Sequence, residues 1–245
     1  MNGFLTDALL LSVRLLPILV VAPVVVFSRV PLTVRLILTL ALAAIMSGAL
    51  PSSDIKPSVE ALFGEFLLGA VMAFGFHAAH AGLDLAGKLI DAQIGLNAAG
   101  IFDPGTSNMS GLLAEFLAIA FSLLFIALDF HHALLRVFAD LITVIPPGSV
   151  TAAALNVSFV SIMTQQFLLA FMLVVPITIG LWLTDASFAM LSRSMPQANV
   201  YFLALPVKLA VGVLLLLLTL PLIVQRIPLL FENALRFSAS PAGVP

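Results

Sequence analysis

One polar, turn-forming stretch interrupts an otherwise apolar chain: Phe102-Asp103-Pro104-Gly105-Thr106-Ser107-Asn108-Met109-Ser110-Gly111. A glycine-rich helical pattern from Gly82 to Gly100 precedes it, and an apolar run from Leu112 to Leu128 follows. Proline fixes its own φ, glycine adopts positive φ, and Asp, Ser and Asn bond to nearby backbone, so these residues predict a chain reversal. Its backbone polar groups would lack partners in lipid. We therefore expect it to be buried against protein or to line a water-filled path.

The composition is that of a membrane protein. Hydrophobic residues make up 62% of the 245 residues, charged residues make up 9%, and the mean hydropathy is +1.20. Soluble domains are about 45–50% apolar and about 25% charged. The net charge is −2 without a basic cluster, so we expect no nucleic-acid partner. Cysteine is absent, which excludes disulfides and thiolate metal sites.

Helices alone explain the rest of the pattern, and we predict an all-α fold with no β-sheet. A membrane-spanning helix needs about 20 apolar residues. Six segments approach that length: Leu5–Phe27, Leu32–Leu50, Ala61–Ala81, Leu112–Leu128, Phe167–Leu183 and Phe202–Val224. Prolines inside or beside them predict kinks, because proline removes a helical donor; these are Pro17, Pro23, Pro176 and Pro221.

Shorter elements complete the prediction. Residues His131 to Ile145 place Leu and Phe side chains on one face and predict a short amphipathic helix. Pro146-Pro147-Gly148-Ser149 predicts a break. Residues Thr151 to Ser192 predict a long helical arm, and Pro228 to Phe237 a separate last helix.

Charged residues inside apolar segments are the first candidates for function, since such residues usually face protein or water and pair with one another. Asp84, Lys88 and Asp91 share one helix face, so Lys88 can bridge either carboxylate. They form either a proton or ion relay or, as we favour, a self-neutralised seam against another subunit. Five more charges qualify for pairing between subunits, with the two cations as opposites of the three acids: Glu115, Asp129, Asp185, Arg14 and Lys208.

Signs of catalysis or of a bound cofactor are missing from the sequence. His77 and His80 are spaced for chelation but lack a supporting carboxylate or cysteine, and His131 and His132 are explained by packing at a helix end. The glycines from Gly64 to Gly100 fit close helix packing rather than a phosphate loop. We therefore expect no metal, no cofactor and no enzyme activity.

Three stretches together resemble the FliR family of type III secretion export gates. They are Arg29-Val30-Pro31-Leu32-Thr33-Val34-Arg35, then Gly87-Lys88-Leu89-Ile90-Asp91-Ala92-Gln93-Ile94-Gly95 running into Phe102-Asp103-Pro104, and His131-His132-Ala133-Leu134-Leu135 leading to Pro146-Pro147-Gly148. The similarity covers essentially the whole chain. The middle stretch is the most specific of the three.

The resemblance implies a place in a larger assembly. Members of this family assemble with FliP and FliQ into a cone-like helical gate, with FlhB attached and FlhA beneath, in the bacterial inner membrane at the flagellar basal body. It implies a FliP-like part, roughly 1–150, and a FliQ-like hairpin, roughly 151–245. Unfolded proteins would pass the gate, driven by partners and the proton motive force. Membrane lipid and neighbouring subunits would surround the helices.

The resemblance also implies a role for the polar interruption as a plug in the central channel. Its residues are Phe102, Asp103, Pro104, Gly105, Thr106, Ser107, Asn108, Met109 and Ser110. Gly105 and the small polar residues permit two backbone arrangements, and Phe102 and Met109 can add an apolar seal.

Two alternatives to a flagellar export gate stay open: the gate of a virulence secretion system, and a stand-alone secondary transporter that uses Asp84, Lys88 and Asp91 for ion coupling.

Overall fold

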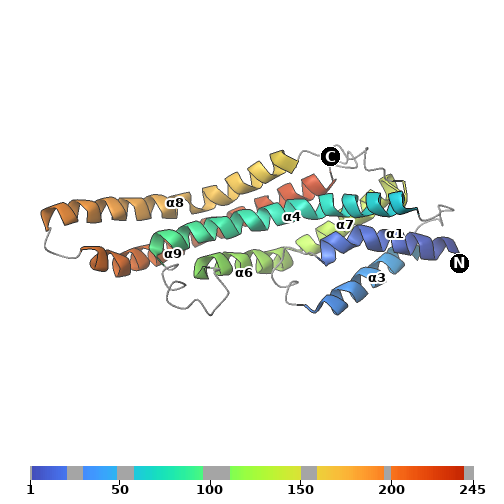
Figure 1. Cartoon of the computed structure of the whole chain (residues 1–245), viewed down its shortest axis with the longest axis horizontal. Helices are drawn as coiled ribbons and strands as arrows, with labels where there is room; N and C mark the ends of the chain where they lie inside the picture. The colour runs from blue at the N-terminus through green and yellow to red at the C-terminus, as the bar shows by residue number, and fades with distance from the viewer. Residues whose placement is uncertain are drawn as a thin grey trace.

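The computed structural model describes residues 2–20, 30–48, 58–95, 111–149, 159–195 and 200–239. Within these ranges the chain is helical and contains no strand, as the sequence predicts. Figure 1 shows an elongated bundle in which the start of α1 and the end of α9 lie toward the same end. Its helices are α1 (Asn2–Leu19), α3 (Leu32–Gly48), α4 (Val59–Ile94), α6 (Leu112–Ala127), α7 (Phe130–Val144), α8 (Phe159–Ser194) and α9 (Val200–Ala239).

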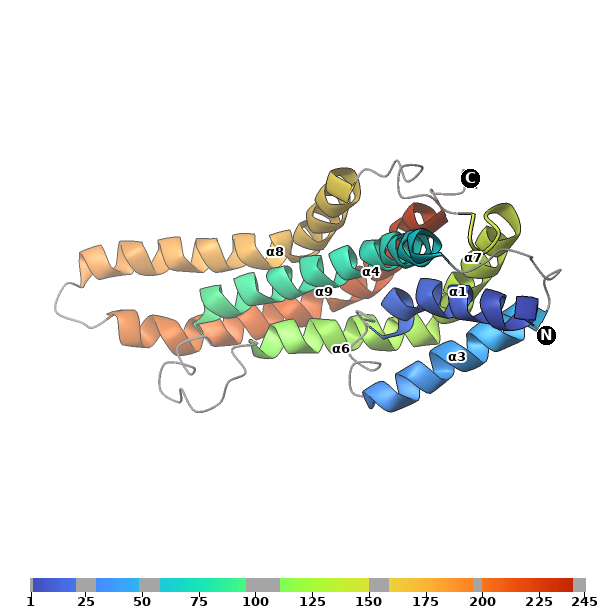
Figure 2. The same ribbon diagram turned by 45° about the vertical axis from the view of Figure 1, so that its right-hand side comes forward.

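Helix α4 is the central element, and every other helix except α3 and α7 packs along it at length. Ser58 caps its start, because the Ser58 hydroxyl accepts a hydrogen bond from the Ala61 backbone N–H at 3.1 Å. Gly95 ends it in the left-handed conformation, with φ of 87°. Figure 2 shows α1 and α3 beside one end of α4, and α6 and the hairpin of α8 and α9 beside the other.

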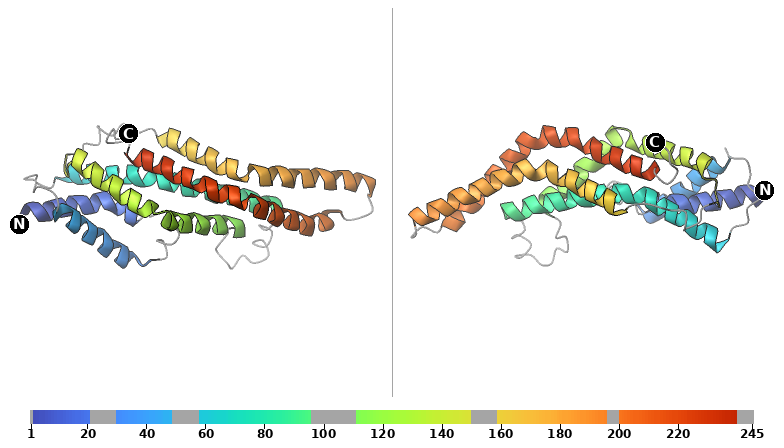
Figure 3. Two further views of the ribbon diagram at one scale, coloured as in Figure 1. Left: turned by 180° about the vertical axis from the view of Figure 1, so that it is seen from behind. Right: turned by 90° about the horizontal axis from the view of Figure 1, so that it is seen from above.

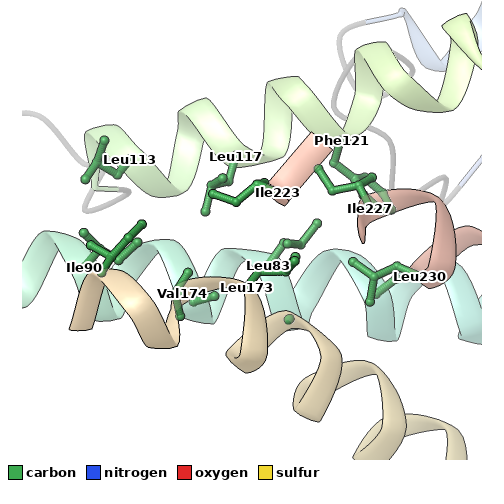
Figure 4. Packing of buried hydrophobic residues seen from close by; sticks show 14 of the residues in the cluster. Leu83, Ile90, Leu113, Leu117, Phe121, Leu173, Val174, Ile223, Ile227 and Leu230 are labelled. Carbon is green, nitrogen blue, oxygen red and sulfur yellow. The ribbon is translucent and has the colours of Figure 1, made fainter. Parts of the chain in front are cut away.

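Two hydrophobic clusters lie along α4, one toward its first half and one toward its second half. One joins α4 to α1, α3 and α7, and includes Leu15, Met72 and Phe138. The other joins α4 to α6, α8 and α9, as the packing around Leu83 and Ile90 shows (Figure 4). A single long helix therefore holds the two halves of the bundle together.

Three helices in the described ranges are long and apolar enough to cross a membrane: α4, α8 and α9. Helices α6 and α7 together form a further candidate, bent by 64° at residues 128–129. Asp129 stands at that bend with φ of 57°, a conformation that Asp tolerates better than most residues. Two other apolar segments form α1, of 18 residues, and α3, of 17 residues; the remainder of these predicted segments, from residue 21 and from residue 49, lies outside the described residues.

The predicted separate helix from Pro228 to Phe237 is wrong, because α9 runs from Val200 to Ala239 without a break. Pro206, Pro221 and Pro228 all lie inside it. Proline is tolerated in such a helix where neighbouring helices hold it, and Ile227 and Phe231 are fully buried in the cluster with α4 and α6. The amphipathic helix at 131–145 and the break at 146–149 are confirmed by α7 and the turn after it. Figure 3 shows the change of direction along α8, the helix that contains Pro176.

Candidate functional site

Asp91 is a fully buried carboxylate on the last turn of α4, and it caps a different helix. Its two oxygens accept hydrogen bonds from the backbone N–H groups of Leu113 and Ala114, both at 3.1 Å. These donors belong to the first turn of α6, where backbone N–H groups lack partners within the helix and the helix dipole favours a negative charge. The backbone carbonyl of Asp91 also accepts from Gly95 N–H. Asp91 thus contacts described residues on both sides of the segment 96–110.

Glycines make this arrangement possible. Gly111 occupies the cap position of α6 and has no side chain of its own to supply the cap. A Cβ at Gly111 would lie 1.8 Å from an oxygen of Asp91. A Cβ at Gly87 would lie 2.3 Å from the Cα of Ala114, so α4 and α6 approach each other closely. We call Asp91, Gly95, Gly111 and the α6 N–H groups of Leu113 and Ala114 the loop clamp.

Arg14 and Glu65 form a second buried polar site at the other end of α4. Both side chains are fully buried, and Arg14 Nη2 donates to Glu65 Oε1 at 3.0 Å. Arg14 also donates to the carbonyl of Ile145, and the backbone N–H of Gly148 donates to Glu65 at 2.7 Å. The pair therefore ties α1, α4 and the end of α7 together. Arg14 was a candidate; Glu65 was not, although it too is a charge inside an apolar segment.

The charges at Asp84, Lys88, Asp185 and Lys208 find partners within the chain. Lys88 Nζ lies 2.6 Å from Asp84 and does not bridge to Asp91, whose carboxylate turns toward α6. Lys208 on α9 lies 2.7 Å from Asp185 on α8. The three-residue seam expected on α4 is therefore a surface pair plus a separate buried cap. Pairing of these charges with other subunits stays a prediction.

Glu115 and Asp129 are exposed in the isolated chain rather than buried. Asp129 Oδ1 lies 3.2 Å from His132 Nδ1, within hydrogen-bond distance, and one ligand atom each from Asp129, His131 and His132 fall within 4.8 Å of one another. This ligand set suits a divalent metal chemically. Asp129 and His132 are largely exposed, and an ion pair at the start of α7 explains their contact equally well.

The predicted plug residues, 102–110, lie outside the described residues, and their role stays a prediction. The loop clamp, whose residues flank the segment 96–110, lies within the described residues. Among the described residues, no nucleophile, base and orienting group come together as catalysis requires. The grooves between helices are lined mainly by Leu, Met and Phe.

Membrane-length apolar helices with a buried charge pair, Arg14–Glu65, define an α-helical membrane protein. The family model for bacterial export proteins, family 1, matches residues 5–234, and the chain belongs to this family. It is a family of protein-export components.

Three similar proteins share the same name. "Flagellar biosynthetic protein FliR" of Aquifex aeolicus (strain VF5) is 30% identical over 229 residues, which are 90% of this chain and 87% of the relative. The protein of that name from Escherichia coli (strain K12) is 27% identical over 228 residues, 90% and 86% of the two chains. The Bacillus subtilis (strain 168) protein is 26% identical over 223 residues, 88% and 86%.

Proposed function

We propose that this chain is a subunit of the flagellar type III export gate and forms part of the channel through which unfolded flagellar proteins cross the inner membrane. Family membership and the flagellar names of its relatives support flagellar service over a virulence system. FliP, FliQ, FlhB and FlhA are the proposed neighbours. The antiparallel hairpin of α8 and α9 suits a FliQ-like part, and α1 to α7 suit a FliP-like part.

The loop clamp is the observation that carries the proposed plug. A segment that stoppers a channel must stay attached at both ends while its middle moves. Asp91 joins the last turn of α4 to the first turn of α6 at one buried point, so the residues that flank the segment 96–110 are held together there. We expect Thr106 to Ser110, the last residues of that segment, to take two backbone arrangements.

Deleting Thr106 to Ser110 tests the plug. We expect the deletion to raise the permeability of flagellated cells to small ions, while tagged FliP and FliQ still co-purify with the chain. A control substitution, Arg236→Gln on the exposed side of the last turn of α9, should change neither. Unchanged permeability in a correctly assembled deletion variant would remove the plug role but leave the gate assignment standing.

The mass of the detergent-extracted protein separates the gate from a transporter. A gate subunit should run as a large hetero-complex, because its exposed apolar side chains, such as Trp182 and Leu217, need partners or lipid. A stable monomer that binds a small substrate would contradict the proposal.

A further inference from the structure

The α8–α9 hairpin presents an apolar outer face between two polar borders. One border is the Asp185–Lys208 pair, and the other is Arg226 on α9. At about 1.5 Å per residue, α9 rises about 27 Å from Lys208 to Arg226. The hydrocarbon core of a bilayer is about 30 Å thick, so the two borders are spaced like its two surfaces.

The threonines between these borders need no external partner. Thr178 and Thr184 on α8 donate to the carbonyls of Val175 and Gly180, both at 2.9 Å. Thr219 on α9 donates to its own helix at 2.8 Å. A helix whose hydroxyls bond back to its own backbone can face hydrocarbon without an unsatisfied group.

The chain's single tryptophan marks the first border. Trp182 is 60% exposed and lies one turn before Asp185. Tryptophan gathers at membrane–water interfaces, where its ring meets the headgroups. The border at Asp185 therefore has the composition of an interface.

Arg226 lines a groove at the second border. The groove has a volume of about 120 Å³ and runs between α8 and α9 where Pro176 bends α8. Its walls are otherwise apolar and include Leu169, Met172 and Leu222. No hydrogen bond or ion pair joins the Arg226 guanidinium to any residue in the described part of the chain, and its side chain is exposed.

We propose that Arg226 and this groove bind an anionic phospholipid. The guanidinium offers parallel N–H donors that match a phosphate, and the apolar walls accept the first part of an acyl chain. A free phosphate would gain nothing from those walls. The Lys88 cation on α4 is already paired with Asp84 at 2.6 Å, so it does not offer a phosphate an unpaired cation as Arg226 does.

The test uses the full chain within its tagged complex, extracted in mild detergent and exchanged with phosphatidylglycerol or phosphatidylcholine. Native mass spectrometry counts the lipids retained. A basic residue near anionic lipid contributes about 1 kcal/mol, which is about fivefold in affinity. We expect about a fivefold preference for phosphatidylglycerol, its loss in Arg226→Gln, and its partial retention in Arg226→Lys.

Arg236→Gln, a change on the last turn of the same helix, is the matched control and should keep the preference. Excess inorganic phosphate should not displace the lipid. The proposal is overturned if the wild-type complex shows no headgroup preference, if Arg226→Gln keeps it, or if inorganic phosphate alone removes it. Release of a partner subunit by Arg226→Gln with an unchanged lipid count would identify a protein carboxylate as the occupant instead. Lipid counting needs no export activity, so its failure is distinct from failure of the proposed function.

Discussion

Replacing Asp91 with alanine should loosen the start of α6 while leaving the rest of α4 intact. The change removes both acceptors of the Leu113 and Ala114 backbone N–H groups, each held at 3.1 Å. These donors are buried, so their hydrogen bonds to a charged group are worth more than neutral ones. Gly111 has no side chain that can take over the cap.

The expected loss follows from these contacts. Removing a helix cap costs about 0.5–2 kcal/mol, and a hydrogen bond to a charged group contributes about 1.5–3 kcal/mol. We take about 2 kcal/mol for the local opening of the first turn of α6, which corresponds to about a 30-fold increase in its population.

A substitution at Gly111 tests the same contact from the side of α6. Gly111→Ser alone should be harmful, because a Cβ there lies 1.8 Å from the Asp91 carboxylate. In an Asp91→Gly background all three atoms that this Cβ would meet are absent, and the cap backbone at position 111, with φ of −61° and ψ of 151°, suits serine. The double variant Asp91→Gly with Gly111→Ser should therefore recover about 1 kcal/mol relative to Asp91→Gly alone.

Hydrogen exchange of the backbone N–H groups of Leu113 and Ala114, read by mass spectrometry of the intact complex, measures this opening. We expect about 30-fold faster exchange in Asp91→Ala, partial recovery in the double variant relative to Asp91→Gly, and no change in Asp84→Ala. Unchanged exchange in Asp91→Ala, or additive harm from the two substitutions, would refute the clamp.

Three further predictions concern packing and surroundings. Arg14→Met should destabilise the detergent-extracted chain by about 3–5 kcal/mol in thermal unfolding, because it leaves the Glu65 carboxylate buried without its cation; Arg14→Met with Glu65→Leu should recover much of this. Gly87→Ala should cost about 1–3 kcal/mol in the same assay, since the added Cβ overpacks the contact of α4 with α6. Fluorescence of Trp182 should be quenched by brominated phosphatidylcholine in vesicles.

Each of these has a matched control. Replacing the Asp185–Lys208 pair by neutral residues should cost only about 0–1 kcal/mol, because Asp185 is half exposed; an equal loss at both pairs would contradict the assigned burial. Ala92→Leu, on the exposed face of α4, should be tolerated where Gly87→Ala is not. A tryptophan at the buried position of Phe76, in a Trp182→Phe background, should not be quenched. Strong quenching there would contradict the claim that the outer face of the α8–α9 hairpin, and not the core, faces lipid.

The helices themselves were predictable because hydrophobic periodicity and length carry that signal. The long arm of α8, the amphipathic α7 and the turn at 146–149 all follow from residue patterns. The continuity of α9 through Pro228 was not predictable locally. It depends on burial of Ile227 and Phe231 against helices distant in sequence, and tertiary packing there outweighs the local cost of proline.

For the charged residues, too, the sequence predicts one part of the outcome and leaves another part to tertiary structure. Their burial or pairing was predictable from their apolar surroundings, but the choice of partner was not. Lys88 has one carboxylate a turn before it and another a turn after it on the same helix face, and only the position of α6 decides that Asp91 serves as a cap instead. Glu65 was overlooked although the rule that identified Arg14 applies equally to it.

Site-specific photo-cross-linking to a stalled export substrate tests the central claim most directly. A photoreactive residue at Met109, in flagellated cells that carry an export substrate blocked by a folded tail, should cross-link to that substrate. The same residue at Val160, exposed on α8, should not. Substrate cross-links at Val160 but none at Met109, in an assembled complex, would place the export path elsewhere and contradict the proposed gate.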